Sequence, residues 1–202
     1  MKNTNHSLFD KYEMIKDLGT GSSGSVTLVR HISMDQERAL KKVPKASAFA
    51  ESALSEARLL KSLEHPSIPR IFDFEEDNAF YYIVEEYIDG ETLDSFLLHQ
   101  QLISPGLFFN ICEQLCNVFI YLHTQISTPI IYRDLKPEHI IVCHNKLKLI
   151  DFGVSAYVIQ DGNNFNHYGN IEFSAPECFI EDTITPAADI YSLGQLLQYI
   201  LT

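Results

Sequence analysis

The sequence predicts an α+β fold in which a β-rich first part of the chain precedes a mainly helical second part. Short apolar runs separated by glycine- and proline-containing turns fill residues 12–87. Apolar residues at helical spacing dominate residues 88–202. We therefore expect two lobes over these two ranges, preceded by a polar segment at 1–11. A cleft between lobes is a usual place for a ligand.

The first part contains the signals of five strands and one helix. Apolar runs around a glycine-rich turn predict three strands within 12–43, and Pro44 ends the third. Alanine and leucine residues recur at helical spacing over 47–63, which predicts a helix. Residues 70–74 and 80–87 then form the two arms of an expected hairpin.

Helices dominate the second part. They are expected at 92–99, 105–124 and from about 187 to the end, with Ser104 as an N-cap and Pro105 at the first helical position. Short strands are expected at 140–142 and 147–150, and a polar loop at 160–170.

Composition narrows the classes of function. The chain has 202 residues, 46% of them hydrophobic, and a formal net charge of −12. This acidic balance argues against binding to a nucleic-acid backbone. No run approaches the roughly 18 apolar residues of a membrane span. We therefore expect no membrane contact within this chain. The four cysteines show no metal-binding spacing, and free thiols without an apolar signal segment at the N-terminus are typical of a reducing cytoplasm.

A glycine-rich segment, GTGSSGSV at 19–26, is the first candidate binding site. Glycines allow the backbone to approach phosphates without an intervening Cβ. The segment leads into a strand and not a helix, which disfavours a dinucleotide site, and it lacks the Gly-Lys-Ser/Thr of a P-loop. The alternative interpretation, in which this segment is a hairpin turn that binds no ligand, is not excluded at this point.

Charged residues in apolar surroundings are the next candidates for functional residues. Lys41 lies in the apolar third strand and needs an anionic partner if it faces a cleft. Glu56, on the following helix, is a candidate partner. Solvated side chains at both positions are the alternative interpretation.

The segments YRDLKPEH at 132–139 and DFG at 151–153 carry the strongest chemical signal. Their aspartates, Asp134 and Asp151, suit phosphoryl transfer, because one carboxylate can accept a hydroxyl proton while the other holds a metal on the phosphates. Lys136 can neutralise the transferring phosphoryl group.

With APE at 175–177 and DIYSLG at 189–194, the chain resembles the protein kinase superfamily, particularly the Hanks-type (eukaryotic-like) bacterial Ser/Thr protein kinases. The resemblance covers nearly the whole chain, from Tyr12 to Thr202. It implies a bilobal protein-kinase-like fold with an incomplete C-lobe at 88–202. It also implies transfer of the ATP γ-phosphate to Ser/Thr hydroxyls of protein substrates, with Mg²⁺ as cofactor.

The resemblance also implies residues that bind the nucleotide. Gly19, Thr20, Gly21 and Gly24 lie in the loop that covers the phosphates. Adenine is sandwiched by Val26 and Ala39 on one side and Ile141 on the other, and it meets hinge backbone groups at Glu86 and Ile88. Lys41 matches the lysine on the α- and β-phosphates, and Glu56 its partner.

The catalytic residues follow in the same way. Asp134 matches the catalytic base, Lys136 marks Ser/Thr rather than Tyr kinases, and Asp151 matches a magnesium ligand. Asp189 matches the aspartate that supports the catalytic loop.

Three positions depart from the family pattern. Tyr132 replaces a packing histidine, and Glu85 falls at the back of the adenine pocket. His139 replaces the asparagine that binds the second metal ion, so either one metal site is weakened, or Mn²⁺ is favoured, or catalysis is lost. His139 and Glu85, with the incomplete C-lobe, keep a pseudokinase as the alternative: a nucleotide-binding or scaffolding module with little transfer activity. Tyr132 is aromatic and can fill the histidine position, so we expect little effect from it.

The last expected helix presents Ile190, Leu193, Leu197 and Ile200 at helical spacing. No later helix of this chain is available to cover it. We therefore expect either marginal stability or contact with a second copy or another partner through this surface.

Overall fold

The computed structural model describes residues 8–21, 24–100, 102–157, 170–180 and 184–202. The chain forms two compact units. The first comprises residues up to Leu63 together with Pro69–Tyr87, and the second comprises Glu64–Ile68 and Ile88–Thr202. Residues 160–169 of the expected polar loop lie outside the described residues.

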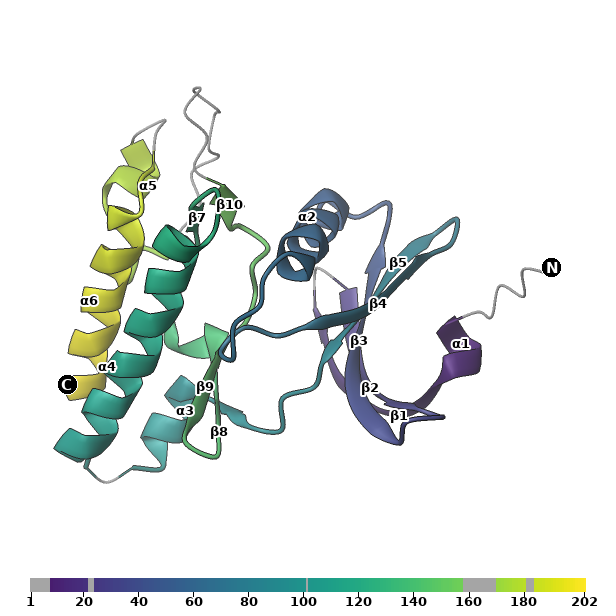
Figure 1. Ribbon diagram of the computed structural model, residues 1–202, viewed down its shortest axis with the longest axis horizontal. Coiled ribbons are helices and arrows are strands. Elements are labelled where there is room, and N and C mark those ends of the chain that lie inside the picture. Colours follow the sequence, from purple (N-terminus) through teal and green to yellow (C-terminus); the bar gives the residue numbers. More distant parts are fainter. Residues whose placement is uncertain (1–7, 22–23, 101, 158–169, 181–183) are drawn as a thin grey trace. The chain divides into compact units, whose positions relative to one another are not determined.

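A five-stranded antiparallel sheet forms most of the first unit (Figure 1). Its spatial order is β1-β2-β3-β5-β4. The strands are β1 (Tyr12–Gly21), β2 (Gly24–His31), β3 (Gln36–Pro44), β4 (Ile71–Glu76) and β5 (Phe80–Glu86). The unit's main helix is α2 (Ala50–Lys61), which lies within the predicted helical range.

Alternation along β3 and β5 divides their side chains between two small cores. Val43 and Ile83 pack with Ala53 and Ala57 of α2. Leu40, an even-numbered residue of β3, belongs to the other core. That core also contains Leu8, Tyr12, Val29, Tyr82 and Val84. The odd-numbered positions of β3 therefore share the face that α2 covers, and Lys41 is among them.

A short helix, α1 (Leu8–Lys11), precedes the sheet. The Leu8 side chain is completely buried, and its backbone N–H donates to Glu75 Oε2 at 2.8 Å. Lys11 Nζ lies 2.8 Å from Asp73 Oδ2. These contacts attach the end of the predicted polar segment to β4, and nothing in its local sequence pattern indicated them.

The second unit is mainly helical. Its α-helices are α3 (Leu93–Leu98), α4 (Pro105–Ile120), α5 (Glu177–Ile180) and α6 (Ala187–Leu201). Ser104 Oγ accepts the Leu107 N–H at 3.2 Å, which confirms the predicted N-cap. A π-helical turn, η1 (Tyr121–Gln125), ends the predicted helix at 105–124.

Short strands complete this unit. β6 (Glu91–Thr92), β8 (Ile140–Cys143) and β9 (Lys146–Leu149) form an antiparallel sheet in the order β6-β8-β9. β7 (Ile130–Ile131) pairs with β10 (Ala156–Tyr157). Between β7 and β8 lie the 132–139 segment and a 3₁₀ turn, η2 (Pro137–His139). The loop with the candidate catalytic residues is thus held at both ends by strands.

Helix α6 runs beside α4 (Figure 1). Leu193, Leu196 and Ile200 are buried, whereas Ile190 is 54% exposed. The expected apolar stripe is therefore split: Ile190 lies outside the buried face, and Leu196 belongs to it.

Candidate active site

An ion pair links Lys41 of β3 to Glu56 of α2. Lys41 Nζ lies 2.6 Å from Glu56 Oε2, and the side chains are 19% and 7% exposed. Lys41 is on the sheet face that carries Val43, and Glu56 is among the buried residues of α2. The structure thus brings these two sequence-predicted residues together, with a partner for each charge where water is scarce.

The glycine-rich segment joins β1 to β2, and Gly21 and Gly24 pair across the turn. Gly24 has a φ of +139°, and a Cβ there would lie 2.1 Å from the backbone oxygen of Lys42. A Cβ at Gly19 or Gly21 would meet no atom within 4 Å. Position 24 therefore requires glycine, because the backbone there lies close to β3. Gly19 and Gly21 instead leave open space beside the backbone.

The expected adenine-contacting residues divide between the two units. Val26 of β2 lies opposite Lys41, and Ala39 of β3 lies opposite Glu85. Glu86 ends β5, and its N–H donates to the Arg70 carbonyl oxygen at 2.9 Å. Ile88 and Ile141 belong to the second unit, where Ile141 pairs with Thr92. Joint contact of this set with a nucleotide stays a prediction.

The catalytic-loop segment is held by Asp189 of α6, which is completely buried. The backbone N–H groups of Tyr132 and Arg133 donate to its two carboxylate oxygens, each at 2.8 Å. His123 Nε2 lies 2.8 Å from Asp189 Oδ2. Asp189 thus makes the contacts expected of the aspartate that supports the catalytic loop. His123 also contacts this carboxylate, and the sequence did not reveal that contact.

Asp134 and Lys136 face each other within this loop. Lys136 Nζ donates to Asp134 Oδ2 at 2.9 Å, and the Lys136 and Asp134 side chains are 22% and 19% exposed. A carboxylate that can accept a proton thus lies beside a fixed positive charge. The motif predicted a role for each of the two residues, and the structure adds the contact between them.

His139 connects Asp134 to Asp151. Its Nδ1 lies 3.1 Å from the Asp134 backbone oxygen and 3.4 Å from Asp134 Oδ2. Its Nε2 lies 3.5 Å from Asp151 Oδ2. Within the described ranges, no cluster of three or more His, Cys, Asp or Glu side chains is arranged to hold a metal ion. A metal at Asp151 and His139 would therefore need further ligands from a nucleotide or water.

Tyr132 contributes more than the packing expected of it. Its ring centroid lies 5.0 Å from that of Phe152, in an edge-to-face arrangement, and its hydroxyl donates to the Ile150 carbonyl oxygen. Tyr132 is completely buried. The bond joins the catalytic loop to the residue before Asp151. A hydroxyl at a position where the family has histidine was the only sequence signal for it.

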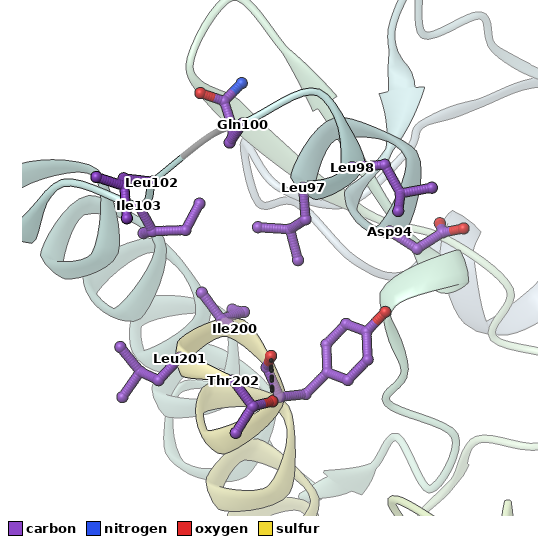
Figure 2. A pocket seen from close by; sticks show the side chains of 10 residues that line it. Asp94, Leu97, Leu98, Gln100, Leu102, Ile103, Ile200, Leu201 and Thr202 are labelled. Carbon is purple, nitrogen blue, oxygen red and sulfur yellow. Dashed lines mark hydrogen bonds between the residues drawn. The ribbon is translucent and has the colours of Figure 1, made fainter.

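A separate groove lies where the end of α6 meets the loop after α3 (Figure 2). Its volume is about 520 Å³, and apolar side chains such as Leu97, Ile103 and Ile200 line it. None of the predicted site residues contributes to its wall. The groove is therefore distinct from the candidate catalytic group.

Comparison with known proteins defines the class to which this fold and site correspond. Residues 12–202 match the family described as protein kinase domain, and the chain belongs to this family. The expected α+β protein-kinase-like fold is thereby confirmed.

Individual relatives include several serine/threonine kinases. The chain is 31% identical over 201 residues to serine/threonine-protein kinase PrkC of Bacillus subtilis, covering 95% of this chain and 30% of PrkC. It is 30% identical over 208 residues to serine/threonine-protein kinase PknB of Mycolicibacterium smegmatis, covering 96% and 33%. It is 32% identical over 217 residues to calcium-dependent protein kinase 4 of Plasmodium falciparum, covering 100% and 39%. The chain thus spans 30–39% of the length of these three relatives.

Across the described part of the chain, no helix has the length and apolar character needed to cross a membrane.

Proposed function

We propose that this chain is the catalytic part of an ATP-dependent protein Ser/Thr kinase. The observation that carries the proposal is the linked group in the second unit. Asp134 Oδ2 lies 2.9 Å from Lys136 Nζ and 3.4 Å from His139 Nδ1, and His139 Nε2 lies 3.5 Å from Asp151 Oδ2. A base, a fixed cation and a metal-binding carboxylate are the groups that phosphoryl transfer requires.

Each residue has a separate part in this proposal. Asp134 orients the substrate hydroxyl and accepts its proton. Lys136 lies beside Asp134 and stabilises negative charge on the transferring phosphoryl group. Lys41, held by Glu56, binds the α- and β-phosphates under the loop that contains Gly19 and Gly21.

Asp151 fits the divalent metal that the family uses. Its side chain is 51% exposed. Oδ1 accepts the Gly153 N–H at 3.2 Å, which orients the group. Mg²⁺ is the metal expected from the family, with Mn²⁺ as the alternative that His139 raises. When bound, the metal neutralises charge on the nucleotide phosphates.

The test uses the complete gene product, labelled ATP and a general protein substrate. Asp134→Asn removes the base while preserving the shape of the side chain, so phosphate transfer should fall at least about a hundredfold, the lower range for general base catalysis. Glu91→Gln, a carboxylate outside this group, is the matched control and should retain the parent rate. Transfer by Asp134→Asn at the parent rate would contradict the role of Asp134. Nucleotide binding by the parent protein without any transfer would favour the pseudokinase.

We further propose that the protein acts on protein substrates in the cytoplasm. All four cysteines are free thiols, which is typical of a reducing compartment. An in-cell fractionation experiment tests this location. Recovery of the complete gene product in an oxidising compartment would contradict it.

Contact with a second copy or another partner through the second unit also stays a prediction. Leu98 and Leu102 are 85% and 89% exposed beside the groove in Figure 2, and Leu201 is 66% exposed. Exposed apolar surface of this kind favours association. Sedimentation of this chain at increasing concentration should show a rising apparent mass. A constant monomer mass without binding of a hydrophobic dye would contradict the prediction.

A further inference from the structure

The tautomer of His139 is determined by the oxygens around its Nδ1. This nitrogen lies 3.1 Å from the Asp134 backbone oxygen and 3.4 Å from Asp134 Oδ2. A carbonyl oxygen only accepts hydrogen bonds, and so does a carboxylate that receives the Lys136 ammonium at 2.9 Å. Nδ1 therefore carries the hydrogen. In the neutral ring, Nε2 then presents its lone pair to Asp151.

Main-chain hydrogen bonds place His139 next to the segment that leads into Asp151. The Ile150 N–H donates to the His139 carbonyl oxygen at 2.9 Å, and the His139 N–H donates to the Lys136 carbonyl oxygen at 3.0 Å. The His139 side chain is only 12% exposed. Imidazole and carboxylate therefore project from neighbouring backbone segments that are hydrogen-bonded together.

The separation between His139 Nε2 and Asp151 Oδ2 can be compared with the separations expected for a hydrogen bond and for two ligands of one cation. A charge-assisted N–H···O bond is normally about 2.7–2.9 Å long, and the observed separation is 3.5 Å. Two ligands about 2.1 Å from one metal ion, at an angle of about 90–110°, lie roughly 3.0–3.4 Å apart. The separation is thus closer to that of two ligands of one cation than to that of a direct hydrogen bond.

We propose that His139 Nε2 and Asp151 Oδ2 form a mixed nitrogen–oxygen site that selects Mn²⁺ over Mg²⁺. The Asp134 backbone oxygen acts as the outer partner that orients the imidazole, as carbonyl groups do for metal-binding histidines. Mg²⁺ prefers oxygen ligands and gives up water reluctantly, whereas imidazole suits transition metals. The site rests on the proposed function, because nucleotide phosphates supply the remaining ligands.

The decisive experiment observes the metal directly and does not require catalysis. The complete gene product is loaded with Mn²⁺ and a non-hydrolysable ATP analogue, and pulsed electron paramagnetic resonance is recorded. A histidine ligand produces nitrogen modulation of the Mn²⁺ signal, which changes when the protein is labelled with ¹⁵N-histidine. We expect this modulation in the parent protein and its loss in His139→Asn and His139→Gln.

A binding measurement provides a second readout. Calorimetry gives the Kd of the analogue with each metal, and the parent should bind it more tightly with Mn²⁺ than with Mg²⁺. Loss of an outer partner alone typically changes metal affinity by about 10–100-fold, so the Mn²⁺ preference should fall by at least about tenfold when the ligand itself is replaced. His139→Gln places a carbonyl oxygen at similar reach and should retain binding with Mg²⁺. Circular dichroism confirms that both variants fold.

The matched control is another histidine–carboxylate pair. His99 Nδ1 lies 3.0 Å from Glu91 Oε2, and its side chain is 69% exposed. His99→Asn should retain both the nitrogen modulation and the Mn²⁺ preference. Analogue binding without nitrogen modulation, or with a metal preference that His139→Asn leaves unchanged, would overturn the mixed site alone. Absence of analogue binding with either metal would overturn the proposed function as well.

Discussion

Lys41 Nζ lies 2.6 Å from Glu56 Oε2, and this ion pair joins β3 to α2 across 15 residues of sequence. Lys45 and Glu76 form a pair of the same length on the surface, where the Glu76 side chain is 55% exposed. The two pairs have the same distance and differ in burial. We therefore expect the buried Lys41–Glu56 pair to hold α2 in position. The Lys45–Glu76 pair should contribute little, because water can solvate both of its charges.

Glu56→Gln should lower the free energy of unfolding by about 1–3 kcal/mol, because it removes the Glu56 charge from beside a largely buried ammonium. Phosphate transfer should fall with it, since Lys41 loses its fixed position. Urea unfolding and a transfer assay measure the two effects. Glu76→Gln is the control and should change neither appreciably. Equal effects of the two substitutions would contradict the assigned difference.

Asp189→Ala should destabilise the second unit strongly. The change removes the acceptor of the Tyr132 and Arg133 N–H groups in a completely buried position. Each orphaned donor costs about 1–3 kcal/mol, so we expect a loss of about 2–6 kcal/mol. Denaturant unfolding measures it. Asp35→Asn neutralises an 85% exposed carboxylate, and asparagine tolerates the φ of +50° at this position, so the change should have little effect. A similar loss there would argue against the buried support.

Leu8→Ala tests the attachment of α1 to the sheet. Leu8 is completely buried, so its truncation should lower the free energy of unfolding by about 2–5 kcal/mol. Ile32, 59% exposed, supplies the control substitution Ile32→Ala with a smaller loss. An unchanged melting temperature for Leu8→Ala would mean that α1 does not contribute to the core in solution.

His65 should make folding sensitive to mild acid. Burial lowers the pKa of His65 below its ordinary value, and the Lys148 charge lowers it further. Its Nδ1 also accepts the Ser67 N–H at 3.1 Å, which a protonated ring cannot do. The unfolded chain then binds the proton more readily, so stability is present above about pH 6.5 and declines below it.

Unfolding free energies at about pH 7.5 and about pH 5.5, on either side of the ordinary histidine pKa, measure this effect. His65→Gln should show a smaller decline between the two values than the parent. The same decline in both proteins would assign the acid sensitivity to other groups.

Cys178 should resist alkylation in the native protein, whereas the exposed Cys116 should react. Cys178 is 1% exposed, and burial, with the nearby Glu177 charge, raises the pKa of its thiol, so little thiolate is present. Mass spectrometry after limited iodoacetamide treatment measures both sites. Rapid modification of Cys178 before unfolding would show that its packing against Ile131 and Ala188 is open.

Local signals predicted most of the elements and the residues of the candidate site. The Ser104 cap, the helix around Ala53 and Ala57 and the strand that holds Lys41 depend on residues within a few positions of one another. Motif spacing likewise identified Asp134, Lys136 and Asp151. Helix α1 was missed because its stability comes from Leu8 contacting β4 and the sheet, 67 residues away in the case of Glu75.

The sequence by itself determined which chemical groups this protein carries and their order along the chain, because motifs and periodicity are local properties. Only the tertiary structure decided which groups meet: His123 reaches Asp189 across 66 residues, and the Tyr132 hydroxyl reaches the Ile150 carbonyl oxygen. It also decided that His139 turns Nδ1 to Asp134 and Nε2 to Asp151. Such contacts depend on how distant segments pack, since a ring orientation follows from the oxygens that surround it.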